Sequence, residues 1–342
     1  MKKTVKILFK CIIASTISII LLSMFSLIYY NPPVAIQQPD FITNFKFKEN
    51  SKWSYMLEGF GHGMTDNLGY NNAYYTDCTE PDIVFIGSSH LEALQVPQED
   101  NCVYLLNEKF DKDNLSYNDF KCLNLGISAN AFEVSVSNFP YVIDKYKDAK
   151  YIVIETSNVK FSPTMLDDIA EGKFHVPEEE KGFAHKIARS IPYIRFINKK
   201  INEANTAKAD IEPLANDLNA DDDINIYIDK MNAILHELSE KSAENDIKLV
   251  VLLHQRFWED TDRNIITENS AKYIDSFKEC CENNNIKVID VTKEMIEVYK
   301  KDFDFSYGFS NTAPGEGHLN KTGHRIIAEE VYKNINEMEE RK

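Results

Sequence analysis

The chain has 342 residues, of which 43% are hydrophobic, and its formal net charge is −16 at pH 7. This length and hydrophobic content suffice for the core of one large domain or two small ones, so we do not expect a disordered chain. The acidic balance repels phosphate backbones, and we therefore expect no nucleic-acid partner.

The amino-terminal segment has the pattern of a membrane anchor. Four lysines lie within residues 1–10, and an uncharged, mostly apolar stretch follows from Cys11 to Tyr30. About twenty such residues in a helix match the thickness of a bilayer. The lysines predict a cytoplasmic tail over residues 1–10 and an extracytoplasmic location for the chain after the anchor. A cleaved signal peptide is the alternative, but no small-x-small site precedes Asn31, so we favour an uncleaved signal-anchor.

Beyond the anchor, residues 31–52 are predicted to form a stalk and residues 53–342 a folded domain. Short apolar runs that end at turn residues indicate buried strands. These strands alternate with helical segments, which predicts right-handed βαβ units and a three-layer α/β/α sandwich with a parallel, flavodoxin-like sheet. The expected strands are Asp82–Ile86, Lys121–Leu125, Tyr151–Ile154, Lys248–Leu253 and Lys287–Val291. The expected helices cover residues 130–147, 225–245 and 268–285, with a last one from Lys321 to the end.

Two features interrupt this regular pattern. A helical insertion with an acidic part is expected over about residues 161–224. The six cysteines show neither a CxxC pair nor a Cys/His zinc spacing, which favours neither a metal site nor a disulfide scaffold. Cys11 lies in the apolar run, and Cys280 and Cys281 are adjacent in a predicted helix. One disulfide could form among the other three, Cys78, Cys102 and Cys122.

Ser89 is the first candidate for chemistry. It follows the first strand in Gly87-Ser88-Ser89-His90, where a helix is expected to begin. A serine at such a turn exposes its hydroxyl and has a free backbone amide, which suits a nucleophile that helps to bind its own oxyanion. The alternative is that Ser88 or Ser89 is only a helix N-cap.

His318 is the candidate general base. It lies in a Gly-rich loop just before the last helix, and such a loop could bring it to the strand ends. A solvent-exposed loop histidine is the alternative. His324 is a second candidate, although it falls on the helix itself.

Several segments, in the correct order, resemble the sequence blocks of the SGNH/GDSL hydrolases. Gly87–His90 resembles the Gly-Asp-Ser block, with Ser89 as the nucleophile and Ser88 in place of the family's Asp. The other matching segments are Asn124-Leu125-Gly126, Tyr151–Asn158 and His318–His324, and Thr65–Tyr70 looks like a segment of membrane-anchored members that modify surface sugars.

The resemblance implies a serine mechanism with no metal and no cofactor. It assigns the oxyanion hole to the amides of Ser89 and Gly126 and to the side chain of Asn158, with Ser157 as the alternative. The family's acid position, three residues before the base, is Gly315 here. Glu316 is the nearest acid, Asp302 and Asp304 lie further upstream, and a Ser–His dyad is a further option.

Two more histidines are expected to bind substrate, His90 beside Ser89 and His254 at the end of the fourth strand. The following pair, Phe257 and Trp258, could stack on a sugar, but packing in the core is favoured. The resemblance and the anchor together imply a membrane-anchored serine esterase that acts on O-acyl esters of cell-surface carbohydrate or on another small ester. The alternatives are an O-acyltransferase for an envelope polysaccharide and a non-catalytic scaffold or glycan-binding protein.

Overall fold

The computed structural model describes residues 2–37, 45–112, 120–128, 130–174, 191–209 and 224–340. Its centre is a five-stranded parallel sheet with the strand order β12-β9-β8-β6-β7. In chain order this is the 2-1-3-4-5 arrangement of flavodoxin-like folds, so the predicted α/β class and its sheet are confirmed. The strands are β6 (Ile83–Ile86), β7 (Cys122–Asn124), β8 (Tyr151–Thr156), β9 (Lys248–Leu253) and β12 (Lys287–Asp290).

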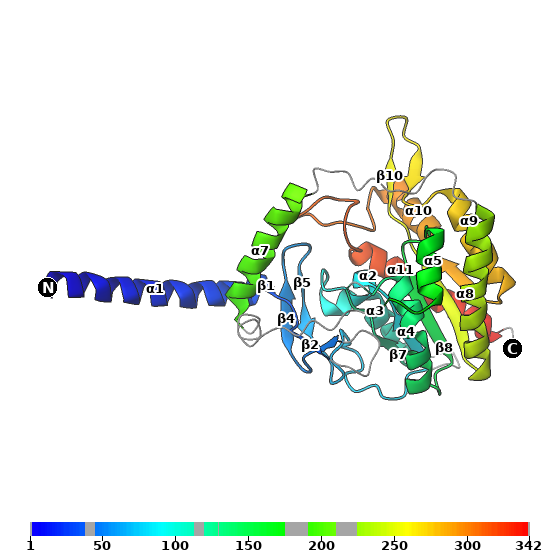
Figure 1. Ribbon diagram of the computed structural model, residues 1–342, viewed down its shortest axis with the longest axis horizontal. Helices are drawn as coiled ribbons and strands as arrows, with labels where there is room; N and C mark the ends of the chain where they lie inside the picture. Colours follow the sequence, from blue (N-terminus) through cyan, green and yellow to red (C-terminus); the bar gives the residue numbers. More distant parts are fainter. Residues whose placement is uncertain are drawn as a thin grey trace.

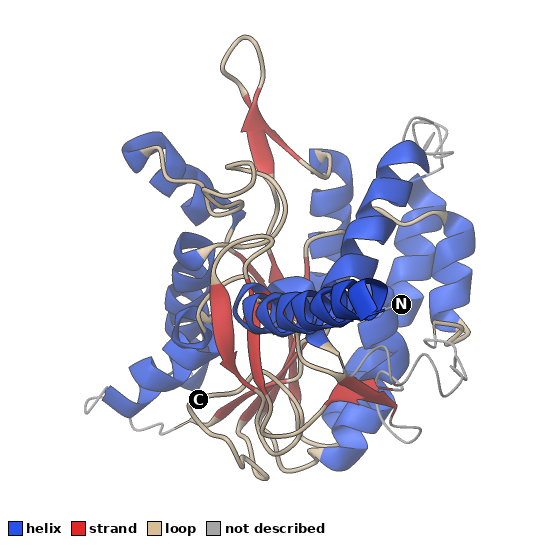
Figure 2. Ribbon diagram, turned by 90° about the vertical axis from the view of Figure 1, so that its left-hand side faces the viewer, coloured by secondary structure: helices blue, strands red, loops and turns tan. Residues whose placement is uncertain are grey.

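The strands are apolar almost throughout because helices cover both faces of the sheet (Figure 2). Alternate residues of β6 enter different cores: Val84 and Ile86 face one layer, whereas Ile83 and Phe85 face the other. The first layer contains α4 (Phe132–Lys145), α5 (Pro163–Ala170), α8 (Ile224–Glu244) and α9 (Ala271–Asn283). The second contains α3 (Cys102–Lys112), α10 (Thr292–Asp302) and α11 (Lys321–Glu340).

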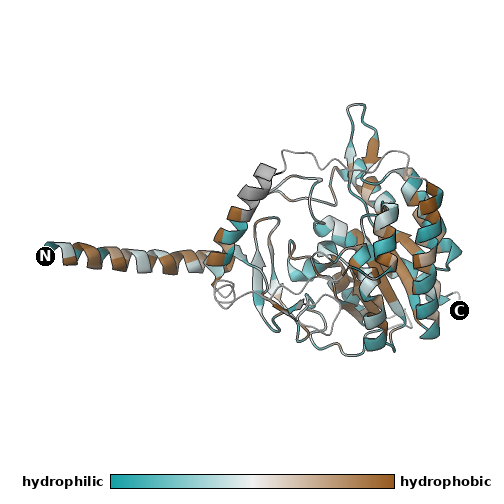
Figure 3. Cartoon of the chain, viewed as in Figure 1, coloured by the Kyte–Doolittle hydropathy of each residue, from teal (hydrophilic) through white to brown (hydrophobic). Residues whose placement is uncertain are grey.

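The amino-terminal helix α1 (Lys2–Tyr29) projects away from the domain (Figure 1). Its apolar side chains are exposed along most of its length (Figure 3). Among the described residues, it alone is long and apolar enough to cross a membrane. By length and composition it therefore fits either an anchor or a signal sequence.

The segment expected to be a stalk forms strands instead. β1 (Tyr30–Asn31) follows α1 directly and pairs with β4 (Lys52–Tyr55), which pairs in turn with β5 (Gly61–Met64). A second small hairpin joins β2 (Ala35–Gln37) to β3 (Phe45–Phe47). The helix α7 (Pro192–Ala209) of the expected insertion lies across the end of α1 (Figure 1). The described part of that insertion also contains α5, whereas residues 175–190 and 210–223 lie outside the described residues.

Two smaller expectations have mixed outcomes. All six cysteines are free, so Cys78, Cys102 and Cys122 form no bridge. The hairpin of β10 (Phe257–Glu259) and β11 (Ile265–Thr267) projects from the domain (Figure 1). Within it Phe257 is buried, as the core interpretation requires, whereas Trp258 is 45% exposed.

Candidate active site

Ser89 lies at the turn between β6 and the short helix α2 (Ser89–Glu92). Ser88 is the N-cap of this helix, because its Oγ accepts a hydrogen bond from the amide of His90 at 3.2 Å. The capping role therefore falls to Ser88, and the hydroxyl of Ser89 is left to point elsewhere. In the sheet, β6 is the neighbour of β8, and the strand order reverses between these two strands. Sites in such sheets occur at this switch point.

His318 meets Ser89 as expected of a general base. Its Nε2 lies 2.9 Å from Ser89 Oγ. The loop that carries His318 is fixed by a bridge between Tyr307 and Leu319, and the amide of Gly308 donates to the carbonyl of His318. The imidazole side chain is 27% exposed, so the site is open to a substrate.

The acid that holds His318 is Glu58, a residue that the sequence did not single out. Its Oε2 lies 2.7 Å from His318 Nδ1, and its Oε1 accepts the backbone amide of His318 at 2.8 Å. Burial raises the pKa of Glu58, but the hydrogen bonds and charge of His318 outweigh this and lower it below 4.5. Glu58 is therefore a carboxylate at neutral pH, and it fixes both the orientation and the tautomer of the imidazole.

The acid considered from the sequence, Glu316, faces away from His318. Its Oε2 lies 3.3 Å from Nη1 of Arg256. Asp304, another of the acids considered, accepts a hydrogen bond from the hydroxyl of Thr322 at 2.6 Å. The acid beside the base thus comes from an element 260 residues upstream of His318 rather than from its own loop.

Glu58 lies in the turn between β4 and β5, and Asn311 and Gly317 of the His318 loop contact this turn. Asn311 accepts from the amide of Gly59 at 2.9 Å and donates to the carbonyls of Met56 and Gly59 at 3.1 and 3.0 Å. Gly317 has a φ of +79°, and a Cβ at this position would lie 2.2 Å from Glu58 Oε1. Glycine is therefore required there, both by the backbone conformation and by the approach of the carboxylate.

A second, buried carboxylate–histidine pair lies beneath the nucleophile turn. Glu155 accepts from the amide and hydroxyl of Ser88 at 2.7 and 2.9 Å and lies 2.7 Å from His254 Nε2. The Nδ1 of His254 is 2.5 Å from the hydroxyl of Tyr307. His254 is 0% exposed, so it belongs to this internal network. The expectation that it binds substrate is therefore not met.

His90 separates the two histidine systems. Its ring centroid lies 5.0 Å from that of His254 and 5.2 Å from that of His318. Its Nδ1 accepts the amide of Leu319 at 3.3 Å. Burial and then the charges of neighbouring histidines lower the pKa of His90 well below 6.5, so it is neutral near pH 7. These contacts assign His90 to holding the His318 loop.

The expected oxyanion donors differ in whether the structure already gives them another hydrogen-bond partner. Ser89 is in the first turn of α2, where backbone amides lack an intrahelical acceptor. The amide of Gly126, by contrast, donates to Asn124 Oδ1 at 2.8 Å. Asn158 is exposed, and its side chain bonds to the backbone of Lys160. Ser157 accepts a hydrogen bond from Asn269 at its carbonyl. Of the expected donors, the amide of Ser89 is therefore the one for which the described part of the structure gives no competing acceptor.

The segment Thr65–Asn72 braces the site from below. Asp66 accepts the amides of Leu68 and Tyr70 at 2.9 and 2.7 Å and the side chain of Asn72 at 2.8 Å. Asn72 in turn bonds to the backbone of Asn124 in β7. The segment therefore ties β7 in place and is structural in its contacts.

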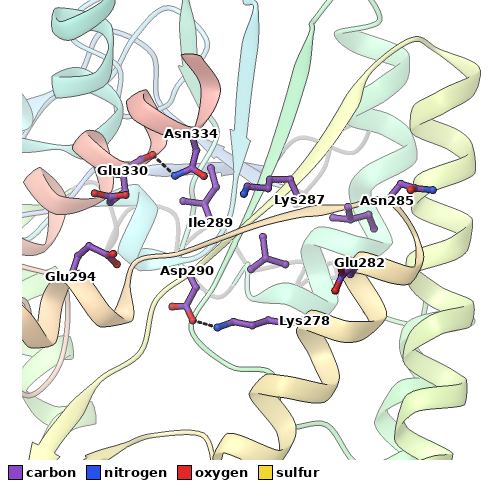
Figure 4. Close-up of a pocket in the computed structure, with 11 residues that line it drawn as sticks. Lys278, Glu282, Asn285, Lys287, Ile289, Asp290, Glu294, Glu330 and Asn334 are labelled. Atoms are coloured by element: carbon purple, nitrogen blue, oxygen red, sulfur yellow. Dashed lines mark hydrogen bonds and ion pairs between the residues drawn. The ribbon is translucent and has the colours of Figure 1, made fainter. Parts of the chain in front are cut away.

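The cavity that stands out in the structure is not lined by the residues of the triad. A cavity of about 720 Å³ lies along β12, lined by residues such as Lys278, Asp290 and Glu330, away from Ser89 (Figure 4). Among the described residues, no group of three or more His, Cys, Asp or Glu side chains could hold a metal ion.

His324 is buried in α11, and its Nδ1 accepts the amide of Cys102 at 3.3 Å, which makes it a core residue.

Comparison with known proteins gives only distant structural likenesses. No protein-family model matches the chain. No curated protein matches it either. An acetyl xylan esterase is 13% identical and has a TM-score of 0.41, with 74% of this chain and 98% of that chain covered. A GDSL-like lipase from Bacteroides thetaiotaomicron is 13% identical and has a TM-score of 0.35, with 78% and 93% covered. An extracellular lipase from Streptomyces rimosus is 10% identical and has a TM-score of 0.33, with 75% and 99% covered.

Proposed function

We propose that this chain is a membrane-anchored serine esterase of the SGNH/GDSL type. The observation that carries the proposal is the continuous chain of contacts from Ser89 Oγ through His318 to the carboxylate of Glu58, at 2.9 and 2.7 Å. A hydroxyl, an imidazole and a partly buried carboxylate in this order have the geometry of a Ser–His–acid triad. The glycine at the family's acid position, Gly315, would favour a non-catalytic scaffold. Glu58 supplies a carboxylate in its place, which favours catalysis.

The chemistry follows from this geometry. Ser89 Oγ attacks the acyl carbon of an ester while His318 Nε2 takes the hydroxyl proton. The imidazolium that forms is stabilised by the carboxylate of Glu58, and the amide of Ser89 donates to the oxyanion. Collapse of the tetrahedral intermediate breaks the bond to the alcohol, which leaves with the proton from His318. Water then resolves the acyl-Ser89 by the same steps and regenerates the serine.

We further propose that the substrates are O-acyl esters of extracytoplasmic carbohydrate or other small esters, met outside the cytoplasm. The four lysines in the first ten residues, at the amino-terminal end of α1, support this orientation. Transfer of the acyl group to a sugar hydroxyl instead of water is the alternative outcome of the same acyl-enzyme, and it would make the chain an O-acyltransferase.

Hydrolysis of p-nitrophenyl acetate by the full chain in detergent tests the proposal. The wild type should release p-nitrophenol and label with a fluorophosphonate, whereas Ser89→Ala should do neither. The matched control is Ser88→Ala, in which the neighbouring hydroxyl is removed but labelling persists. Equal hydrolysis by the wild type and Ser89→Ala would overturn the serine mechanism. Adding a sugar acceptor distinguishes transfer from hydrolysis.

A further inference from the structure

The helix α7 is fixed against the end of α1. The ring of Phe196 lies 6.3 Å from that of Phe25, 5.8 Å from that of Tyr29 and 6.2 Å from that of Tyr30. The guanidinium of Arg195 donates to the carbonyl of Pro32 at 2.6 Å and to the side chain of Asn31. Figure 1 shows α7 running across the axis of α1 at the point where α1 meets the domain.

The remaining sides of α7 differ in polarity. Ile197 and Ile201 are four residues apart, so they share one face, and they are 44% and 52% exposed. Lys199 is two residues from Ile197, which places it roughly 200° around the helix. Lys199 is less exposed than residues 197, 198, 200 and 201, and its charge helps to lower the pKa of Glu58, so its face is turned toward the domain. The isoleucine face is therefore turned away from the domain, toward the side from which α1 projects.

We infer that α7 lies on the membrane surface, with Ile197 and Ile201 inserted into the outer leaflet beside α1. The partner is a lipid bilayer, because the exposed isoleucines lie on a helix that contacts α1, whose own apolar side chains are exposed. A helix that lies across a membrane-spanning helix at its exit point has the orientation of an interfacial helix. Lys200, on the same turn, can extend its ammonium group toward the headgroups.

This arrangement places the candidate active site near the membrane. A helix with its side chains is about 10–12 Å wide, and the charge of Lys199, on the side of α7 opposite the isoleucines, acts on Glu58. The triad would then lie on the membrane-facing side of the domain, whatever reaction it performs. The inference does not depend on esterase activity.

Depth-dependent fluorescence quenching of the full chain in phosphatidylcholine vesicles tests the inference. Cys11 is first replaced by serine, because it is exposed whereas the other five cysteines are buried. Ile197→Cys and Ile201→Cys are then labelled separately with the fluorophore NBD. The control is Glu240→Cys on α8, which lies at the far end of the domain from α1 (Figure 1).

Lipids with a nitroxide at acyl carbon 5 should quench about half of the emission at both isoleucine positions and almost none at residue 240. Circular dichroism shows that each variant is folded. Absence of quenching at both isoleucine positions would overturn the inference, and so would equal quenching at all three.

Discussion

At the residue scale, the candidate site depends on a carboxylate that only the fold brings to its histidine. Glu58 holds both Nδ1 and the backbone amide of His318. Glu58→Gln keeps the shape of the side chain but removes the charge that stabilises the imidazolium, so we expect kcat/KM for p-nitrophenyl acetate to fall roughly 100- to 10,000-fold. Glu316→Gln, at the acid bound to Arg256, should stay within about twofold of the wild type. Equal losses in the two variants would contradict this assignment.

The sequence could identify Ser89 and His318 but not Glu58, for a physical reason. Ser89 follows a buried strand and a glycine, and His318 precedes a long helix, so both stand next to elements that periodicity reveals. Glu58 lies in a short hairpin turn, where an exposed acid is ordinary. The one signal was Gly317, beside the base, whose positive φ and missing Cβ admit the carboxylate. A single sequence does not show what a glycine makes room for.

Glu92 gives the site a pH-dependent stability. It is 1% exposed, its Oε2 accepts the hydroxyl of Ser128, and burial raises its pKa to about 7. The folded chain keeps this proton up to about pH 7, whereas the unfolded chain loses it near pH 4.5. The free energy of unfolding should therefore fall as pH rises from about 4.5 to 7, by on the order of 3 kcal/mol.

The variant Glu92→Gln isolates this effect. An amide does not titrate, so urea unfolding of Glu92→Gln should lose less stability than the wild type between pH 4.5 and 7. Glu240→Gln, at an exposed position on α8, is the control and should follow the wild type. Parallel curves for the wild type and Glu92→Gln would show that Glu92 ionises normally in the folded chain.

At the scale of elements, long apolar runs were predictable and short strands were not. Four of the five sheet strands are almost fully buried and the edge strand β12 is partly buried, so short apolar runs ending at a turn were enough to find them. Residues 31–52 were expected to be a stalk because their strands are two to four residues long and have no period of their own. β1 forms by pairing with β4, and β2 by pairing with β3. Such strands depend on tertiary contacts, which the local sequence does not reveal.

The clamp between the β4–β5 turn and the His318 loop is a testable contact between elements. Asn311→Ala removes three hydrogen bonds to residues 56–59, which leaves Glu58 less firmly placed. We expect kcat to fall about 10-fold with KM unchanged, because a displaced acid affects proton transfer and not substrate binding. Asn311→Asp keeps the acceptor for Gly59 and should recover part of the loss. Thr312→Ala, next to it, should behave as the wild type; a rise in KM alone would contradict a positioning role.

At the scale of the whole molecule, the end of α1 is built into the domain, and this bears on whether α1 is cleaved. The carbonyl of Tyr29 accepts the amide of Met56 at 2.9 Å, two residues before Glu58, and the carbonyl of Leu27 accepts the hydroxyl of Ser54 at 2.8 Å. Removal of α1 by a signal peptidase before Asn31 would delete these acceptors and the ring partners of Phe196. These contacts are the structural reason to expect that α1 is retained.

We therefore expect the chain to keep α1 when it is expressed in bacteria. Intact-mass analysis of the protein extracted from membranes should give the full chain, and alkaline carbonate washing should leave it in the membrane fraction. A chain that begins at or after Asn31 and is released by the wash would contradict an anchor. The β4–β5 hairpin that carries Glu58 pairs with β1, the strand directly after α1, so α1 and the proposed catalytic acid belong to one continuous structure.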